Sequence, residues 1–244
     1  MTTSRFRQDI QGLRGISILS VVIYHAMPSV LPGGFIGVDL FFVISGFVIT
    51  GTILRDYESG RFSVANFYRR RIRRIFPALY FMLAVVIVAA VLLDPPEHLV
   101  QTSESAVATI FFSSNLLFWH RTGYFESSAM LQPLLHTWSL SVEEQFYVLY
   151  PLGFVIVYRH RPRLLRGTLL GAAALSLALS TWMVWKYPTG AFYFAPARAF
   201  ELLLGALVAC PGPKWGPSPR QADALSVAGL ASLLIPLFAF RDST

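Results

Sequence analysis

The chain is poor in cysteine and in charged side chains. Cys210 is the single cysteine among 244 residues, which excludes an intramolecular disulfide and argues against thiol catalysis. Charged residues make up 14% of the chain, with 13 acidic against 20 basic ones. The histidines show no metal-like spacing, so we expect no metal centre, and we interpret His120 and His136, two lone histidines, as structural.

No cleavable signal peptide, soluble domain, internal repeat or low-complexity linker is apparent in the sequence, and we expect none within residues 1–244. The N-terminus has basic residues, but Arg14 and His25 interrupt any apolar core of a leader, and no small-residue cleavage site follows. We therefore interpret residues 1–244 as one membrane domain.

Long apolar runs dominate what is present. Hydrophobic residues make up 55% of the chain and the mean hydropathy is +0.56. A bilayer requires about 20 apolar residues per crossing helix, and the runs that approach this length are 35–54, 75–93, 140–158, 169–185 and 224–240. Residues 12–27 and 199–210 form shorter runs. The pattern predicts an all-α polytopic membrane protein with about seven to eight transmembrane helices.

Basic residues predict the orientation, because short cytoplasmic loops collect arginine and lysine. Most of the basic residues fall on one side if the N-terminus, the segment after residue 54, the segment after residue 158 and the segment after residue 210 are cytoplasmic. Residues 99–119 then cannot be a simple crossing, and their many serine and threonine side chains suit a protein environment better than lipid. We interpret residues 94–138 as an extracytoplasmic excursion; a true crossing that violates the charge rule is the open alternative.

Arg14 and His25 lie in one apolar stretch, eleven residues apart. Eleven residues are almost three helical turns, so both side chains point to the same side, roughly 16 Å apart along the axis. Ionisable residues inside membrane helices are costly and favour a functional interpretation. The pair therefore indicates a polar path through the bilayer, although Arg14 can also snorkel to headgroups while His25 ends the helix.

Five arginines precede the run that begins at residue 75. Arg69, Arg70, Arg73 and Arg74 are spaced so that a helix gathers them on one side. Guanidinium groups suit phosphate oxygens, so the cluster is a candidate for holding a nucleotide-bearing cofactor. The alternative is that it sets topology and contacts anionic lipid.

Two adjacent carboxylates, Glu143 and Glu144, stand near the start of the 140–158 run. They suit the positive end of a helix dipole. Adjacent residues point about 100° apart, so we expect at most one to face the interior. The predicted topology places them on the same side as His25, and a carboxylate that orients an imidazole prepares a general base.

Two further charged positions lie on that outer side. Arg198 and Glu201 are three residues apart and can pair with each other. Asp39 lies about one turn into the second helix, where it can pair with a basic group or cap a frayed end. We take these as candidate members of an outer polar cluster.

Together these segments resemble the acyltransferase-3 family of bacterial membrane O-acetyltransferases, the OafA-like group. The resemblance rests on Arg14 with His25 as the family's Arg-x10-His, the segment 33–47, the arginine cluster running into residues 75–77, the segment 136–147 and the segment 192–205. These segments are spread from residue 5 to about residue 208. The resemblance implies transfer of an acyl group, usually acetyl from cytoplasmic acetyl-CoA, to a sugar hydroxyl outside the bacterial inner membrane.

The resemblance also implies residue roles. We expect His25 to be the general base or a transient acyl carrier, oriented by Glu143 in preference to Glu144. We expect donor binding by the positive side chains of Arg14, Arg69, Arg70, Arg73 and Arg74. We expect substrate binding by the outer residues Asp39, Trp138, Ser139, Arg198 and Glu201. Expected partners are membrane lipid and a cell-envelope glycan such as lipopolysaccharide O-antigen or exopolysaccharide, with no nucleic acid.

The resemblance has one departure. The family's membrane domain usually has about ten helices and is often followed by an SGNH-type esterase-like domain, so residues 1–244 are expected to be an incomplete version of that bundle. The rival hypothesis is a transporter or channel that uses Arg14, His25 and Glu143 as a proton or solute path. No pseudo-symmetric halves are apparent, which argues against it. A third hypothesis is a non-catalytic membrane subunit that needs a partner.

Overall fold

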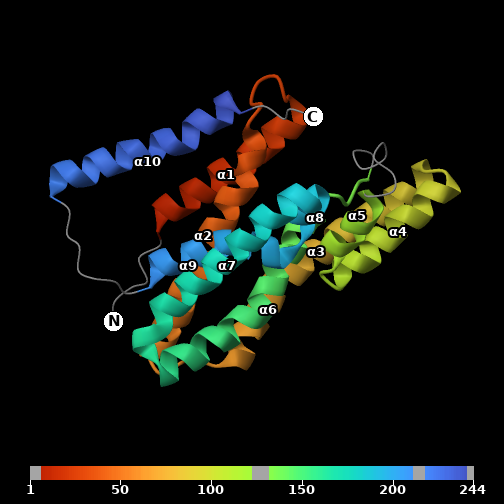
Figure 1. Cartoon of the computed structure of the whole chain (residues 1–244). Coiled ribbons are helices and arrows are strands. Elements are labelled where there is room, and N and C mark those ends of the chain that lie inside the picture. Colours follow the sequence, from red (N-terminus) through yellow and green to blue (C-terminus); the bar gives the residue numbers. More distant parts are fainter. Residues whose placement is uncertain (1–6, 123–131, 211–217, 241–244) are drawn as a thin grey trace.

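The structure is a computed structural model that describes residues 7–122, 132–210 and 218–240. Every regular element in these ranges is a helix (Figure 1): α1 (Gln8–Ala26), η1 (Gly34–Ile36), α2 (Gly37–Glu58), α3 (Val64–Leu93), α4 (Pro96–Ile110), α5 (Ser114–Thr122), α6 (Thr137–His160), η3 (Pro162–Leu164), α7 (Leu165–Lys186), α8 (Pro188–Tyr193), α9 (Ala195–Ala209) and α10 (Pro219–Ala239). The basic residues Arg5 and Lys214 lie outside the described residues.

Five segments are long and apolar enough to cross a membrane: Gly34–Glu58, Val64–Leu93, Thr137–His160, Pro162–Lys186 and Pro219–Ala239. The prediction of an all-α polytopic membrane protein is confirmed. Two further helices belong to the bundle without reaching that length or hydropathy: α1 packs along α2, and α9 packs between α2 and α7. The count of seven or eight crossings depends on these two helices and stays a prediction.

Local sequence explains where several helices begin. The Ser63 side chain accepts a hydrogen bond from the backbone of Asn66 at the start of α3. Ser218 and Gln221 form a reciprocal capping box at the start of α10. Prolines occupy the first turns of α4, α8, α9 and α10, where a missing N–H costs nothing.

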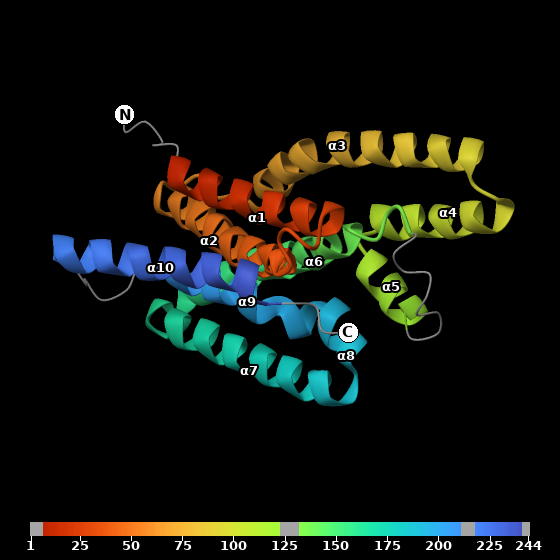
Figure 2. The ribbon, with the colours of Figure 1, turned by 90° about the horizontal axis from the view of Figure 1, so that it is seen from above.

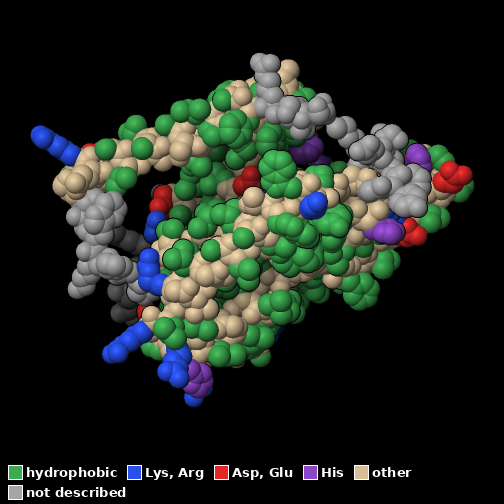
Figure 3. Space-filling model, in the orientation of Figure 1, with side chains coloured by type: hydrophobic (Ala, Val, Ile, Leu, Met, Phe, Trp, Pro, Cys, Tyr) green, Lys and Arg blue, Asp and Glu red, His purple; other side chains and the backbone are tan. Residues whose placement is uncertain are grey.

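The connections α2–α3 and α6–α7 lie at the same end of the bundle, and Lys and Arg side chains gather at this end in the space-filling view (Figures 1 and 3). Exposed residues at the α6–α7 turn are Arg159, Arg161, Arg163 and Arg166. The connections α1–α2, α7–α8–α9 and α3–α4 lie at the opposite end (Figure 2). This arrangement agrees with the predicted grouping of basic segments, and we call the two ends the basic end and the outer end.

Residues 99–119 form two short helices and no single crossing. α4 has 15 residues and α5 has nine, or about 22 Å and 13 Å of helix, against about 30 Å of hydrocarbon. Their hydroxyl groups bond to α6: the Thr109 side chain with Thr137 at 2.9 Å and the Ser114 side chain with Ser141 at 2.8 Å. Several polar residues of this segment are therefore buried against protein, which explains why the sequence looks unsuited to lipid: Thr102, Ser105, Thr109, Ser114 and Asn115.

Two glycines allow α2 and α9 to approach each other closely. A Cβ atom added to Gly46 would lie 1.8 Å from the backbone oxygen of Leu202, and one added to Gly205 would lie 1.8 Å from that of Val43. Such small residues are typical of membrane helix contacts. In contrast, α10 lies beside the bundle and contacts it near η1, where the Gly33 N–H donates to Leu237 (Figure 2).

Candidate active site

His25 lies on the last turn of α1, at the outer end, and its side chain is exposed. Its Nδ1 is 2.9 Å from the backbone oxygen of Val21. A carbonyl oxygen only accepts hydrogen bonds, so Nδ1 carries the hydrogen in the neutral imidazole. The lone pair then resides on Nε2, which is the form that a general base or a nucleophile requires.

A second imidazole meets His25. His136 precedes the first residue of α6, and the centroid of its ring is 4.6 Å from that of His25, with the planes at 88°. The sequence interpretation of His136 as structural did not anticipate this contact. The signal was available, because the predicted topology places both histidines at outer helix ends.

The environment of His136 disfavours its charged form. The His136 ring is exposed at its surface, but partial desolvation against the protein lowers its pKa, and the positive charge that His25 can carry lowers it further. A lowered pKa means that His136 stays neutral down to a lower pH than a free histidine does. His136 is therefore a neutral imidazole at neutral pH.

The structure places Glu143 and Glu144 against Arg71 and away from His25. Arg71 reaches Glu144 with Nη2 at 2.5 Å and Nε at 3.0 Å, and Glu143 with Nη2 at 3.7 Å. The Tyr147 hydroxyl donates to Glu143 at 2.7 Å. Both carboxylates are buried, although at most one was expected to face the interior. No carboxylate of the described residues bonds to His25, because seven residues of α6, about 10 Å, separate His136 from Glu143.

The four arginines predicted to share a helix side are all exposed: Arg69, Arg70, Arg73 and Arg74. Arg70 pairs with Asp56 of α2 at 2.5 Å. Arg71 points inward and keeps 17% of its side-chain surface exposed. It was not among the residues predicted to bind the acetyl donor. A helix with five arginines in six positions must turn at least one of them toward the neighbouring helices. Here that residue is Arg71, which neutralises the buried carboxylates of Glu143 and Glu144.

Arg14 lies apart from this cluster, half-buried against α2, with its guanidinium carbon 5.3 Å from the centre of the Phe41 ring. The contacts of Arg14 and His25 are therefore to different helices, α2 for the first and α6 for the second. That the two side chains line one path stays a prediction.

Four of the five predicted substrate-binding residues meet in one cluster. Arg198 forms ion pairs with both Asp39 and Glu201, the latter at 3.3 Å. Its guanidinium carbon lies 5.9 Å from the centre of the Trp138 ring. The fifth residue, Ser139, lies outside this cluster: its hydroxyl donates to the backbone oxygen of His136 at 3.2 Å.

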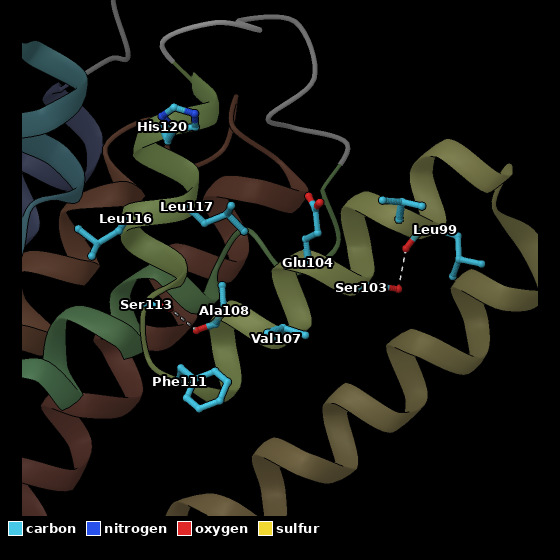
Figure 4. Close-up of a pocket in the computed structure, with 11 residues that line it drawn as sticks. Leu99, Ser103, Glu104, Val107, Ala108, Phe111, Ser113, Leu116, Leu117 and His120 are labelled. Atoms are coloured by element: carbon cyan, nitrogen blue, oxygen red, sulfur yellow. Dashed lines mark hydrogen bonds between the residues drawn. The ribbon is translucent and has the colours of Figure 1, made fainter.

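A hollow of about 870 Å³ opens between α4 and α5 (Figure 4). Its lining is mostly apolar, with Phe111 at one end of the close-up and His120 and Glu104 toward the other. Arg121 pairs with Glu104, so that carboxylate is already engaged. Neither His25 nor His136 lines the hollow. We place the chemistry at the imidazole pair, because the Val21 carbonyl holds the His25 ring in a defined position.

Comparisons with known proteins agree on one family. The family model described as "Acyltransferase domain", of the acyltransferase-3 type, matches residues 7–244. The chain is 37% identical to the peptidoglycan O-acetyltransferase OatA of Listeria monocytogenes, over 94% of this chain and 38% of that protein. It is 33% identical to the O-acetyltransferase OatA of Staphylococcus aureus, over 99% of this chain and 42% of that protein.

The putative peptidoglycan O-acetyltransferase YrhL of Bacillus subtilis is 36% identical over 84% of this chain and 33% of that protein. The chain thus spans about two fifths or less of the length of the curated relatives it matches. No solved structure matches the chain.

The five candidate spans and the matched family agree with the predicted location. The chain is a multi-pass protein of the bacterial inner, or cytoplasmic, membrane. Since the family model covers nearly the whole of it, the chain belongs to the acyltransferase-3 family.

Proposed function

We propose that this chain is a membrane O-acyltransferase, which moves an acetyl group from cytoplasmic acetyl-CoA to a hydroxyl of a cell-envelope glycan. The observation that carries the proposal is the geometry of His25: Nδ1 hydrogen-bonds to the Val21 carbonyl, so the lone pair of the neutral ring is on Nε2. The names of the relatives favour peptidoglycan as the acceptor over lipopolysaccharide O-antigen or exopolysaccharide.

The reaction follows from the chemistry of a neutral imidazole with its lone pair on Nε2. His25 Nε2 takes the proton of the acceptor hydroxyl as its oxygen attacks the thioester carbonyl. The bond from carbon to sulfur then breaks, and the imidazolium returns the proton to the leaving sulfur. The Val21 carbonyl fixes the ring during both transfers, which is the role that the sequence analysis gave to Glu143.

Donor binding is proposed for the basic end. Arg69, Arg73 and Arg74 are exposed and can reach phosphate oxygens, while Arg71 neutralises the buried carboxylates. Arg70 is exposed too, but it already pairs with Asp56. Arg14, midway along α1, would draw the donor from that end toward the outer half. The pantetheine arm would then lie along α1 toward His25.

Acceptor binding is proposed for the Asp39–Arg198–Glu201 cluster with Trp138. The Asp39 side chain keeps 40% of its surface exposed, so one carboxylate of the cluster is open to a ligand. Sugars present hydroxyl groups that suit carboxylates and arginine. Trp138 lies two residues after His136, which places the cluster next to the imidazole pair along α6.

The test is acyl transfer by purified protein carrying H25A. Thiol release from acetyl-CoA in the presence of soluble peptidoglycan fragments should fall about 10²–10⁴-fold, because a general base contributes that much. His98 is an exposed histidine of α4 and gives a matched control, H98A, which should retain wild-type transfer. Wild-type rates in H25A would remove His25 from the mechanism, and a transporter would release no thiol in any variant.

A further inference from the structure

The imidazole of His25 has a partner other than a carboxylate. In enzymes that use histidine as a base, an acidic side chain commonly orients the ring and stabilises its charged form. Here the backbone carbonyl of Val21 orients the ring, and the ring of His136 packs edge to face against it, with centroids 4.6 Å apart.

The carboxylates of the neighbouring helices are already paired with arginines. Asp39 of α2 is tied to Arg198 of α9, Glu143 and Glu144 of α6 face Arg71 of α3, and Glu104 of α4 pairs with Arg121 of α5. Tyr24 of α1 lies against His25 with ring centroids 5.1 Å apart. Within the described part of the chain, no acid therefore bonds to either imidazole.

We propose that His136 is a positioning residue for His25: a neutral imidazole that holds the plane of the reacting ring and stabilises the imidazolium formed on it. This inference rests on the proposed function. When the acceptor O–H bond breaks and an N–H bond forms at His25 Nε2, one positive charge appears on the pair. The new oxygen–carbon bond forms, the carbon–sulfur bond breaks, and the same proton then leaves Nε2 for the sulfur.

His136 suits this role because it does not compete for the proton. Its lowered pKa keeps it uncharged while His25 becomes an imidazolium. A neutral imidazole presents a lone pair or an electron-rich face to the neighbouring cation, and both attract positive charge. A second cation at this place would instead oppose proton uptake by His25.

The test compares H136L, H136Q and the matched control H98L by the pH dependence of kcat/KM, using acetyl-CoA and soluble peptidoglycan fragments. In H136L the imidazolium of His25 loses its stabilising neighbour. The acidic limb of the kcat/KM profile should therefore shift to lower pH by about half to one unit. A base weakened by that amount should lower kcat by about two- to tenfold, with KM nearly unchanged. In H136Q an amide oxygen can still accept from the imidazolium, so rate and limb should lie closer to wild type.

Two outcomes would overturn the inference, and they differ from failure of the proposed function. If wild type and H98L transfer acetyl groups while H136L keeps the wild-type limb, His136 has no electrostatic role. If H136L is slower than wild type but the acidic limb of its pH profile does not move, His136 has only a packing role. If wild type itself shows no transfer to any glycan fragment, the proposed function fails and takes the inference with it.

Discussion

At the scale of residues, an arginine of this bundle is buried where it pairs with buried carboxylates. Arg71 differs from its neighbours in α3 because it is buried against Glu144 and Glu143, whereas Arg69 is exposed. A buried ion pair is costly to break from one side only, because the partner is left charged without water. The backbones of α3 and α6 make few close contacts. The two helices are linked instead by side chains: Arg71 pairs with Glu144, and the Tyr68 hydroxyl donates to the Val148 carbonyl.

Substitution R71M should destabilise the folded protein by about 3–5 kcal/mol, because it leaves two carboxylates in an apolar bundle without their cation. E144Q should cost less, because Arg71 keeps Glu143 at 3.7 Å. The matched control is R69M, which should stay within about 0.5 kcal/mol of wild type. Unfolding of the purified protein in detergent measures all three, and an R71M no weaker than R69M would show that the pair contributes nothing.

At the scale of elements, the contact of α2 with α9 determines the outer polar cluster. Asp39 lies on α2 while Arg198 and Glu201 lie on α9, so their pairing requires the two helices to stay at their present separation. Gly46 and Gly205 set that separation, because any larger side chain would collide with backbone, which cannot rotate away. A stripe of small residues therefore supports a polar site about two turns away.

Substitution G46A should destabilise the bundle by about 1–3 kcal/mol or more, as overpacking does, and should weaken acceptor binding by separating Asp39 from Arg198. Gly51 of the same helix is the matched control, because nothing lies within 4 Å of a Cβ added there. G51A should be neutral or more stable by up to about 1 kcal/mol, since alanine favours helix. Equal stability of the two variants in thermal unfolding would contradict the packing argument.

At the scale of the whole molecule, hydrophobic runs and arginine placement predicted most of the architecture. The five long spans, the shared end of the basic turns and the lack of a single crossing over residues 99–119 follow from composition and length. The division of that segment into two helices was not predicted. The partners of the site residues did not follow. Neighbouring positions such as Arg70 and Arg71 have the same chemistry, and only packing decides that Arg71 faces Glu144. Likewise, nothing next to His136 in the sequence indicates a functional role; only the packing of α1 against the start of α6 places it beside His25.

The central claim is that one bundle joins a donor at the basic end to an acceptor at the outer end. The most direct measurement uses purified protein in vesicles of known orientation, with acetyl-CoA supplied only at the basic end and peptidoglycan fragments only at the outer end. We predict acetylated fragments on the acceptor side and free thiol on the donor side, both lost in H25A. Acetylation that appears only when donor and acceptor share one compartment would contradict the account.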